Sequence, residues 1–386
     1  MEKKKKNIFI ANKSKLFKSL SLLISGFIIT SCGGGGGSSA SSGETVVVSG
    51  QITYDRVPDT EGGLDYTAIE AKPIRRTLVS AIDASSGSIL ENTYSDNSGN
   101  YSFSVPASKS VKITVYSQTE DPIIRIQDNF TFSGAEFARY VMQSSAFSTV
   151  AGVNVTKDLN ADSGYDSTSG KLKNPRVAAP FAILDSCLKA ADFFLFFIAI
   201  TFPSLIVYWD ESNNTTTIGT SNWSGVELFI LGDADQDTDE YDQHVIVHEW
   251  GHYFESKVGR SESVGGGHTD GDILDPRVAF SEGWGNALSA MVLYPDSVYK
   301  DSGGANQGST GVMFDLDENN SELTKDGTFK IGWFSENSVQ SILYDLFDPA
   351  TDDASESWDL LNSNSGVIYD IFTNEVRDTE SLVTIF

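Results

Sequence analysis

Residues 244–252 read HVIVHEWGH, and this stretch contains the spacing H-E-x-x-H. Positions four apart on a helix lie one turn above each other on one face, so His248 and His252 are expected to point the same way. Two imidazoles placed like this can hold one zinc ion, and Glu249 beside them can act as general base on a metal-bound water. The stretch therefore predicts a helix that carries part of a catalytic zinc site.

The flanking residues favour a helix at this position. Asp239, Glu240 and Asp242 precede the motif, where negative charge stabilises a helix N-terminus, and Gly259 follows it as a stop signal. The alternative is a buried helix with incidental histidines. The whole chain has only 4 histidines, and most of them fall within this short stretch, which favours the zinc site.

A catalytic zinc site needs a third protein ligand, and two candidates follow the motif. Glu282 lies in AFSEGWGNAL (residues 279–288), which predicts a helix. Asn286, one turn further on, could accept the outer ring N–H of a ligand histidine. His268 follows three glycines on a predicted loop. We expect Glu282 to be the ligand, because ordering a loop on binding costs about 1–2 kcal/mol per fixed residue.

The H-E-x-x-H motif followed by EGWGN (residues 282–286) resembles the gluzincin metallopeptidases, the thermolysin-like clan, and looks most like their fungalysin-type members. The long metzincin form is excluded, because the chain has Glu255 and Val258 where that form has glycine and histidine. The resemblance covers about the second half of the chain. It implies a zinc metallopeptidase domain over residues 177–386 that hydrolyses peptide or protein substrates, with zinc held by His248, His252 and Glu282.

The resemblance also implies a strand that pairs with the substrate and a side chain that stabilises the oxyanion. Residues 226–232 match the position of the substrate-pairing sheet edge. Thermolysin-like enzymes use a downstream histidine and a tyrosine for the oxyanion, but no histidine follows His268 in this sequence, so Tyr344, Tyr369 and His268 are the candidates. The missing histidine favours an alternative function, a non-catalytic surface adhesin or binding protein on a zincin scaffold. The intact Glu249 argues against that alternative, since a binding protein needs no general base.

Residues 233–239 (DADQDTD) raise the question of a calcium site. An EF-hand loop beginning at Asp233 would need glycine at its sixth position and a carboxylate at its twelfth, where this chain has Thr238 and His244. A less regular Ca²⁺ site needs only several converging oxygens and stays open. The alternative is a solvated acidic loop that caps the following helix.

The first 31 residues have the pattern of a secretion signal. Lysines cluster at residues 3–6, residues 20–30 are apolar, and ITSC at residues 29–32 resembles a bacterial lipobox. This resemblance implies cleavage before Cys32, its lipidation, and sorting to the outer membrane as a cell-envelope lipoprotein. An ordinary signal peptide with a chance cysteine is the alternative, but the Gly/Ser-rich residues 32–43 look like a tether behind an anchor. The apolar residues 193–207 are expected to form a helix and then a strand, because Pro203 interrupts them.

Acidic residues outnumber basic ones, and the formal net charge of the chain is −26. Loss of the leader, with its seven lysines and one glutamate, takes this charge to −32. Such a surface repels nucleic-acid phosphates, so we expect no nucleic-acid partner and a membrane contact through lipid only. Cys187 lies in an apolar helical pattern and is expected to be a buried core residue.

Residues 44–120 predict a β-sandwich, with candidate strands at residues 45–48, 76–82, 101–105 and 111–116. The run from Asp96 to Phe103 resembles carboxypeptidase-regulatory-like and Ig-like modules. Residues 121–176 are assigned to a connecting region, and helices are expected at residues 338–347 and 379–386. The fold class is therefore α+β, with an N-terminal all-β Ig-like sandwich followed by a gluzincin-like catalytic domain.

Overall fold

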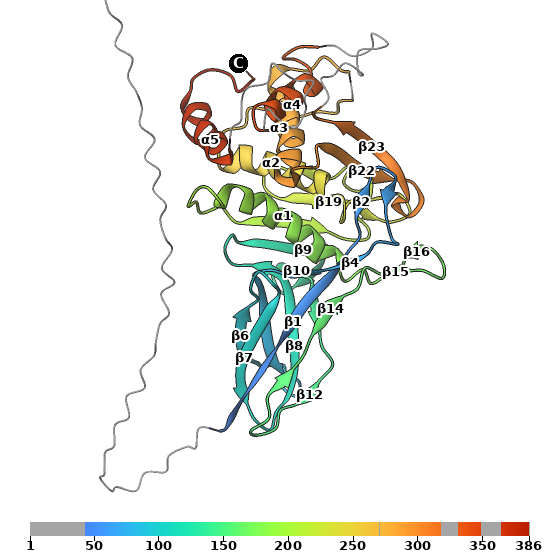
Figure 1. Ribbon diagram of the computed structural model, residues 1–386, viewed down its shortest axis with the longest axis vertical. Coiled ribbons are helices and arrows are strands. Elements are labelled where there is room, and N and C mark those ends of the chain that lie inside the picture. The colour runs from blue at the N-terminus through green and yellow to red at the C-terminus, as the bar shows by residue number, and fades with distance from the viewer. Residues whose placement is uncertain (1–42, 270, 318–330, 349–363, 386) are drawn as a thin grey trace, which may run out of the picture. The chain divides into compact units, whose positions relative to one another are not determined.

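The first part of the chain folds into two β-sheets (Figure 1). The computed structural model describes residues 43–269, 271–317, 331–348 and 364–385. One sheet is centred on β1 (Thr45–Arg56), which pairs antiparallel with β4 (Glu70–Pro73) and β7 (Asn100–Pro106). The same strand pairs in parallel with β13 (Val155–Thr156) and β14 (Leu159–Ala161).

The second sheet joins strands from early and late parts of the sequence. Its order is β18-β19-β17-β9-β8-β5-β6. These strands are β5 (Thr77–Asp83), β6 (Ile89–Tyr94), β8 (Ser110–Thr119), β9 (Ile124–Ser133), β17 (Leu205–Trp209), β18 (Asn222–Trp223) and β19 (Leu228–Ile230). β10 (Glu136–Arg139) also pairs with β9, and β11 (Val141–Gln143) and β12 (Phe147–Ser148) pair with β8. Because β9 and β17 are hydrogen-bonded in parallel, the sheet is continuous between the two regions.

The alternating apolar residues of the N-terminal strands face one core, which they share with a later helix. Val48, Phe103 and Ile113 are buried in this core, as the strand patterns predict. Phe181 of α1 (Ala179–Leu195) and Tyr241 belong to the same core. The strands also continue past residue 120 into the region assigned to a connection, which includes the hairpin of β15 (Tyr165–Asp166) and β16 (Lys171–Leu172). The described residues from Gly43 onward accordingly belong to one compact unit of α+β class.

Helices gather beyond α1, which lies in Figure 1 between the sheets and α2 (Gln243–Lys257). α2 begins after Asp242 and ends just before Gly259, close to the limits expected from the sequence. α3 (Pro276–Leu293) begins where Asp275 accepts a hydrogen bond from the backbone of Arg277. α4 (Glu336–Asp345) and α5 (Ser365–Asp370) follow, and a π-helical turn, Ile371–Val376, extends α5.

Short hairpins complete the fold around α2 and α3. They pair β2 (Asp59–Thr60) with β3 (Gly63–Leu64), β20 (Gly232–Asp233) with β21 (Asp237–Thr238), and β22 (Val298–Gly303) with β23 (Ser309–Asp315). A 3₁₀ turn, Ala305–Gln307, connects β22 to β23. Among the residues described, no helix is long and apolar enough to cross a membrane. Within residues 193–207, α1 ends at Leu195 and β17 begins at Leu205, so this stretch holds the end of a helix and then a strand, as expected.

The helix expected at residues 379–386 is wrong for the described part of that stretch. The Arg260 guanidinium donates hydrogen bonds to the backbone carbonyls of Thr379 and Ser381. The Val383 N–H donates to the Glu262 carboxylate at 2.8 Å, and the Val383 side chain is buried. These contacts use the backbone groups that a helix would pair internally, so the apolar residues of this tail pack in a non-helical segment.

Candidate metal centre

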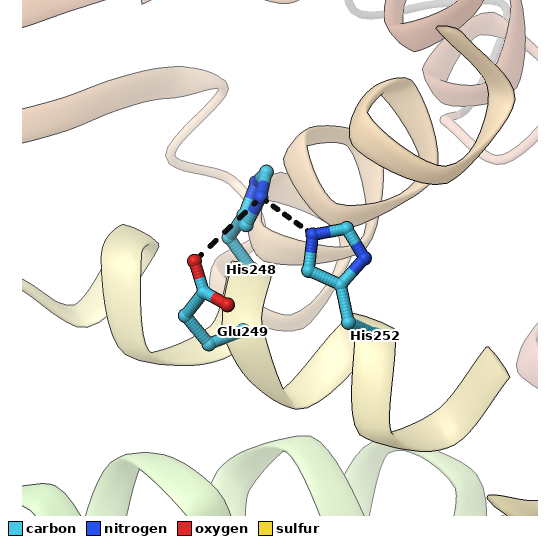
Figure 2. Close-up of side chains that lie close together, drawn as sticks. All are labelled: His248, Glu249 and His252. Carbon is cyan, nitrogen blue, oxygen red and sulfur yellow. Dashed lines mark hydrogen bonds and ion pairs between the residues drawn. The ribbon is translucent and has the colours of Figure 1, made fainter. Parts of the chain in front are cut away.

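Three ligand atoms from α2 and α3 form a nearly equilateral triangle. Figure 2 shows the His248 and His252 rings on one side of α2, with their Nε2 atoms 3.1 Å apart. Oε2 of Glu282, on α3, lies 3.3 Å from each of these nitrogens. A tetrahedral zinc ion with bonds of 2.0–2.1 Å places its ligand atoms about 3.3 Å apart. The residues present therefore fit zinc in both donor type and spacing.

Two carboxylates lie near the imidazoles, and distance separates their roles. Glu249 Oε1 is 3.9 Å from Nε2 of His248, farther than Glu282 Oε2. Glu249 and the two histidines place their ligand atoms within 4.8 Å of one another. Oε2 of Glu282 is closer, at 3.3 Å from Nε2 of each histidine. By distance, Glu282 is therefore the better candidate for a third ligand. Glu249 then stands beside the triangle and lines the same cavity.

Burial raises the pKa of the Glu249 carboxyl group, although the neighbouring histidines oppose the shift. A hydrogen bond from the backbone N–H of Trp223 also holds this carboxylate in place and lowers its pKa. A carboxylate with a raised pKa is a stronger base than an exposed carboxylate. A general base is most effective when its pKa lies near the pH at which the enzyme works. The position and environment of Glu249 thus suit proton transfer more than metal ligation.

The outer nitrogen of His248 is fixed by Asn286. The Asn286 amide donates to Glu336 at 2.8 Å and to Gln340 at 2.7 Å, so both of its N–H groups are used. Its carbonyl oxygen, 2.7 Å from Nδ1 of His248, must therefore accept the proton of that nitrogen. This arrangement leaves Nε2 of His248 unprotonated and directed into the triangle, which is the tautomer that a metal requires.

A second relay orients His252, and the sequence analysis missed it. The Ser281 hydroxyl lies 3.1 Å from Nδ1 of His252 and donates to the Glu255 carboxylate at 2.6 Å. Because that hydroxyl proton is used, its oxygen is available to accept the Nδ1 proton of His252. Glu255 is nearly fully buried, and its spacing of three residues from His252 on α2 was the available signal.

The glycines of the EGWGN segment allow the helices and the histidine ring to approach. A Cβ at Gly285 would lie 2.7 Å from Nδ1 of His248, so only glycine leaves room for this ring. A Cβ at Gly283 would lie 2.7 Å from Cγ1 of Val339 on α4. The Trp284 indole N–H donates to the backbone carbonyl of Gly251 on α2 at 3.1 Å, which ties the two ligand-bearing helices together. The EGWGN motif thus contains Glu282 and also the glycine whose packing positions His248.

The three groups of the triangle shift one another's pKa values. Burial lowers the pKa of both imidazoles, but the Glu282 carboxylate outweighs it, so the pKa values of His248 and His252 are raised. Burial works against ionisation of Glu282 as well, yet the two histidines hold its pKa well below the usual range. The carboxylate therefore stays ionised at neutral pH and presents a negative charge to a bound cation.

The triangle opens into a cavity of about 1070 Å³ that also receives His268. Nε2 of His268 lies 3.3 Å from Glu336 Oε2 and 3.7 Å from Glu282 Oε2. Its Nδ1 is 3.1 Å from the carbonyl of Gly266, which can only accept, so Nδ1 carries a proton. His268 therefore lies at the rim of the triangle rather than within it.

The two tyrosines proposed from the sequence do not line this cavity. Tyr344 is buried in a core cluster with Val245 and Met291, and Tyr369 packs against the core near Phe254. A different tyrosine, Tyr299 on β22, does line the cavity, and its ring centroid is 6.3 Å from that of His248. No local sequence signal marks Tyr299, because the β22–β23 hairpin brings it to the site through tertiary packing.

The sheet edge beside the cavity is β18, not the strand expected at residues 226–232. That segment forms β19, which is hydrogen-bonded to β17 on one side and to β18 on the other. β18 ends the sheet, and both of its residues, Asn222 and Trp223, line the cavity. The expected edge at residues 226–232 is therefore wrong by one strand, because β18 covers β19.

Of the two cysteines, the structure describes only Cys187, which does not line the cavity. Cys32, the expected lipidation site, is outside the described residues. Cys187 is fully buried, and burial raises the pKa of its thiol to about 12, so it behaves as a core residue without nucleophilic character.

Comparisons with known proteins assign no family. No family model matches the chain, and no curated protein matches it. Among solved structures, a match to a 9R-lipoxygenase from Cyanothece PCC8801 has 14% sequence identity and a TM-score of 0.19. The match covers 39% of this chain and 24% of the lipoxygenase chain. A likeness this low carries no argument about fold or chemistry, so the function has to be argued from the residues of the site itself.

Proposed function

We propose that this protein is a zinc-dependent metallopeptidase of the gluzincin type, which hydrolyses peptide bonds in peptide or protein substrates. The observation that carries the proposal is the triangle formed by His248, His252 and Glu282, with edges of 3.1–3.3 Å. The intact Glu249 beside the triangle distinguishes a catalytic centre from a structural zinc site, which has four protein ligands and no adjacent base.

The residues around the triangle supply the remaining steps of hydrolysis. When bound by the triangle, zinc supplies a Lewis acid that polarises the scissile carbonyl and acidifies a water molecule. Glu249 accepts a proton as water attacks the carbonyl carbon and then delivers that proton to the leaving amine. Asn286 and Ser281 hold the two imidazoles in their tautomers throughout. The edge strand β18 offers backbone groups to an extended substrate beside Glu249.

His268 provides the donor for the developing oxyanion. Its Nδ1 proton is used by the carbonyl of Gly266, so Nε2 can donate only from the doubly protonated ring. This Nε2 lies 3.3 Å from the Glu336 carboxylate and 3.7 Å from the Glu282 carboxylate. Tyr299 lines the same cavity and is a second donor. The lack of a histidine after His268 favoured a non-catalytic adhesin. His268 itself lines the cavity, so a later histidine is not needed for this role.

The cellular setting rests on the N-terminal sequence. We propose that Cys32 is lipidated and anchors the protein to the outer membrane, and that the N-terminal strands serve as an Ig-like spacer in front of the gluzincin-like domain. Since these strands share a core with α1, the spacer and the catalytic region are expected to move as one body. Cys32→Ser should shift the protein from the membrane fraction to the soluble fraction on cell fractionation. A variant that still pellets with outer membranes would place the anchor elsewhere.

Glu249→Gln separates catalysis from metal binding. We expect this variant to keep its zinc and its melting temperature but to lose proteolysis of casein by at least about a hundredfold, the upper range for general-base catalysis being about 10⁴. Glu91→Gln is the matched control, because Glu91 is an exposed residue of β6 at the other end of the sheet from β18. Near-normal turnover in Glu249→Gln would refute the proposed mechanism.

A further inference from the structure

A second cluster of ligand groups lies in the same cavity, away from the zinc triangle. Asp237 on β21, Asp239 just after it, and Asp301 on β22 each place one carboxylate oxygen within 4.8 Å of those of the other two. Calcium–oxygen bonds of 2.3–2.6 Å put ligand oxygens up to about 5 Å apart across the ion. The spacing of these three oxygens therefore fits one calcium ion.

Buried oxygen atoms without partners point to the missing ligand. Asp242 is fully buried, its Oδ2 accepts from the Ser302 hydroxyl at 2.7 Å, and its Oδ1 has no hydrogen-bond partner among the described residues. Asp239 is only 2% exposed, with Oδ2 accepting from Ser221 and Oδ1 again lacking a described partner. Oδ1 of Asp237 and Oδ1 of Asp301 are also buried without a hydrogen-bond partner among the described residues. The three clustered carboxylates and Asp242 thus each have a buried oxygen without a partner among the described residues.

The charge of the cluster has no protein counterpart. In the part of the chain that the structure describes, no lysine, arginine or histidine forms an ion pair with Asp237, Asp239, Asp242 or Asp301. Burial, together with repulsion from Asp237, raises the pKa of Asp301 to about 7. Several buried carboxylates in contact destabilise a fold by desolvation and mutual repulsion unless a cation compensates them.

We propose that Asp237, Asp239 and Asp301 form a calcium site that fastens β22 to the segment leading into α2. The donors are all carboxylate oxygens, which suit the hard Ca²⁺ ion and differ from the nitrogen-rich zinc triangle. A lysine or arginine of a substrate is a poorer fit, because Asp239 and Asp242 are buried before any substrate is present. The site is not confined to the contiguous loop at residues 233–239, since one of its three residues, Asp301, comes from β22.

The position of the ion links it to the zinc centre. Tyr299 and Asp301 are two residues apart on β22, so their side chains leave the strand on the same face, and both line the cavity. Fixing Asp301 therefore fixes the strand that presents Tyr299 to His248. This link to catalysis rests on the proposed peptidase function, whereas calcium binding itself does not.

The test uses protein freed of metal and reloaded with zinc alone. Calcium chloride is titrated by calorimetry and melting temperature is recorded, with magnesium chloride in parallel. We expect a dissociation constant on the order of 10⁻⁵–10⁻³ M and a rise in melting temperature that magnesium does not reproduce. Asp301→Asn should weaken calcium binding at least about tenfold, since affinity follows ligand charge. Its melting temperature without calcium should equal or exceed that of wild type, because repulsion is relieved.

Asp235→Asn is the matched control. It removes the same charge from the same acidic hairpin, but Asp235 is exposed and lies outside the cluster. Calcium binding and the calcium-dependent rise in melting temperature should be unchanged in this variant. The proposal is overturned if calcium neither binds nor stabilises wild type, or if Asp235→Asn loses the response as fully as Asp301→Asn. It is also overturned if Asp301→Asn instead slows only the cleavage of substrates with basic side chains, which would make the cluster a substrate pocket. Failure of the peptidase proposal would leave the binding and melting results unaffected.

Discussion

Replacing Gly285 by alanine should disable the metal site while the fold survives. The added methyl group would lie 2.7 Å from Nδ1 of His248 and 2.9 Å from its Cγ and Cε1 atoms. An ordinary contact begins at about 3.5 Å, so the ring has to move by about 0.8 Å. Zinc ligands keep their distances to within about 0.2 Å, so His248 cannot keep both its bond to Asn286 and its place in the triangle.

The size of the effect follows from these distances. We expect zinc affinity to fall by about 10–100-fold, the range seen when a group that orients a ligand histidine is lost. Alanine is favoured over glycine inside a helix by about 1 kcal/mol. This gain opposes the strain at His248, so the free energy of unfolding of the metal-free variant should stay within about 1 kcal/mol of wild type.

Zinc affinity is measured by competition with a chromogenic chelator, and stability by urea unfolding of the metal-free proteins. Gly267→Ala is the matched control, because a Cβ at residue 267 meets nothing within 4 Å. The control should keep wild-type zinc affinity. Wild-type affinity in Gly285→Ala would refute the assignment of His248 as a ligand held by this packing, and an equal loss in Gly267→Ala would show that the effect is not specific.

Two further substitutions test other parts of the account. His268→Ala should keep its zinc but lower kcat by about 10²–10³-fold, the usual loss for one oxyanion donor, and steady-state kinetics with metal analysis would show an unchanged kcat if the assignment is wrong. Burial lowers the pKa of Lys189 on α1 to about 8, so the free energy of unfolding should rise above pH 8, where the folded state releases this proton before the unfolded state does. Lys189→Met should therefore be more stable than wild type at pH 7, with the advantage shrinking toward pH 10 in urea unfolding. A constant difference across this pH range would mean that α1 is not packed on the N-terminal strands as described.

The part of the site on α2 and α3 was predictable, because its signals are local. Helical spacing places His248 and His252 on one face, and the same spacing relates Glu282 to Asn286. The limits of α2 followed from Asp242 and Gly259, which act within one turn. If α2 and α3 are assumed to pack together, Glu282 and Asn286 are expected to face His248 and His252.

The remainder of the site depends on contacts that sequence spacing does not encode. Glu336 and Gln340 reach Asn286 from α4, more than 50 positions away in the case of Gln340, and Asp301 meets Asp237 through a separate hairpin. The parallel pairing of β9 with β17 likewise has no local signal, and it merges regions that the sequence divides at residue 120. The tail at residues 379–385 failed as a helix because Arg260, a distant side chain, captures its carbonyl groups.

The zinc content of purified variants tests the central claim most directly. Wild type reloaded with zinc and dialysed should hold about one zinc ion per chain, and His268→Ala should hold the same amount, because His268 borders the triangle without belonging to it. Glu282→Ala should lose most of its zinc under the same dialysis, since it removes one corner of the triangle. Zinc retained in Glu282→Ala but lost in His268→Ala would contradict the ligand assignment and the mechanism built on it.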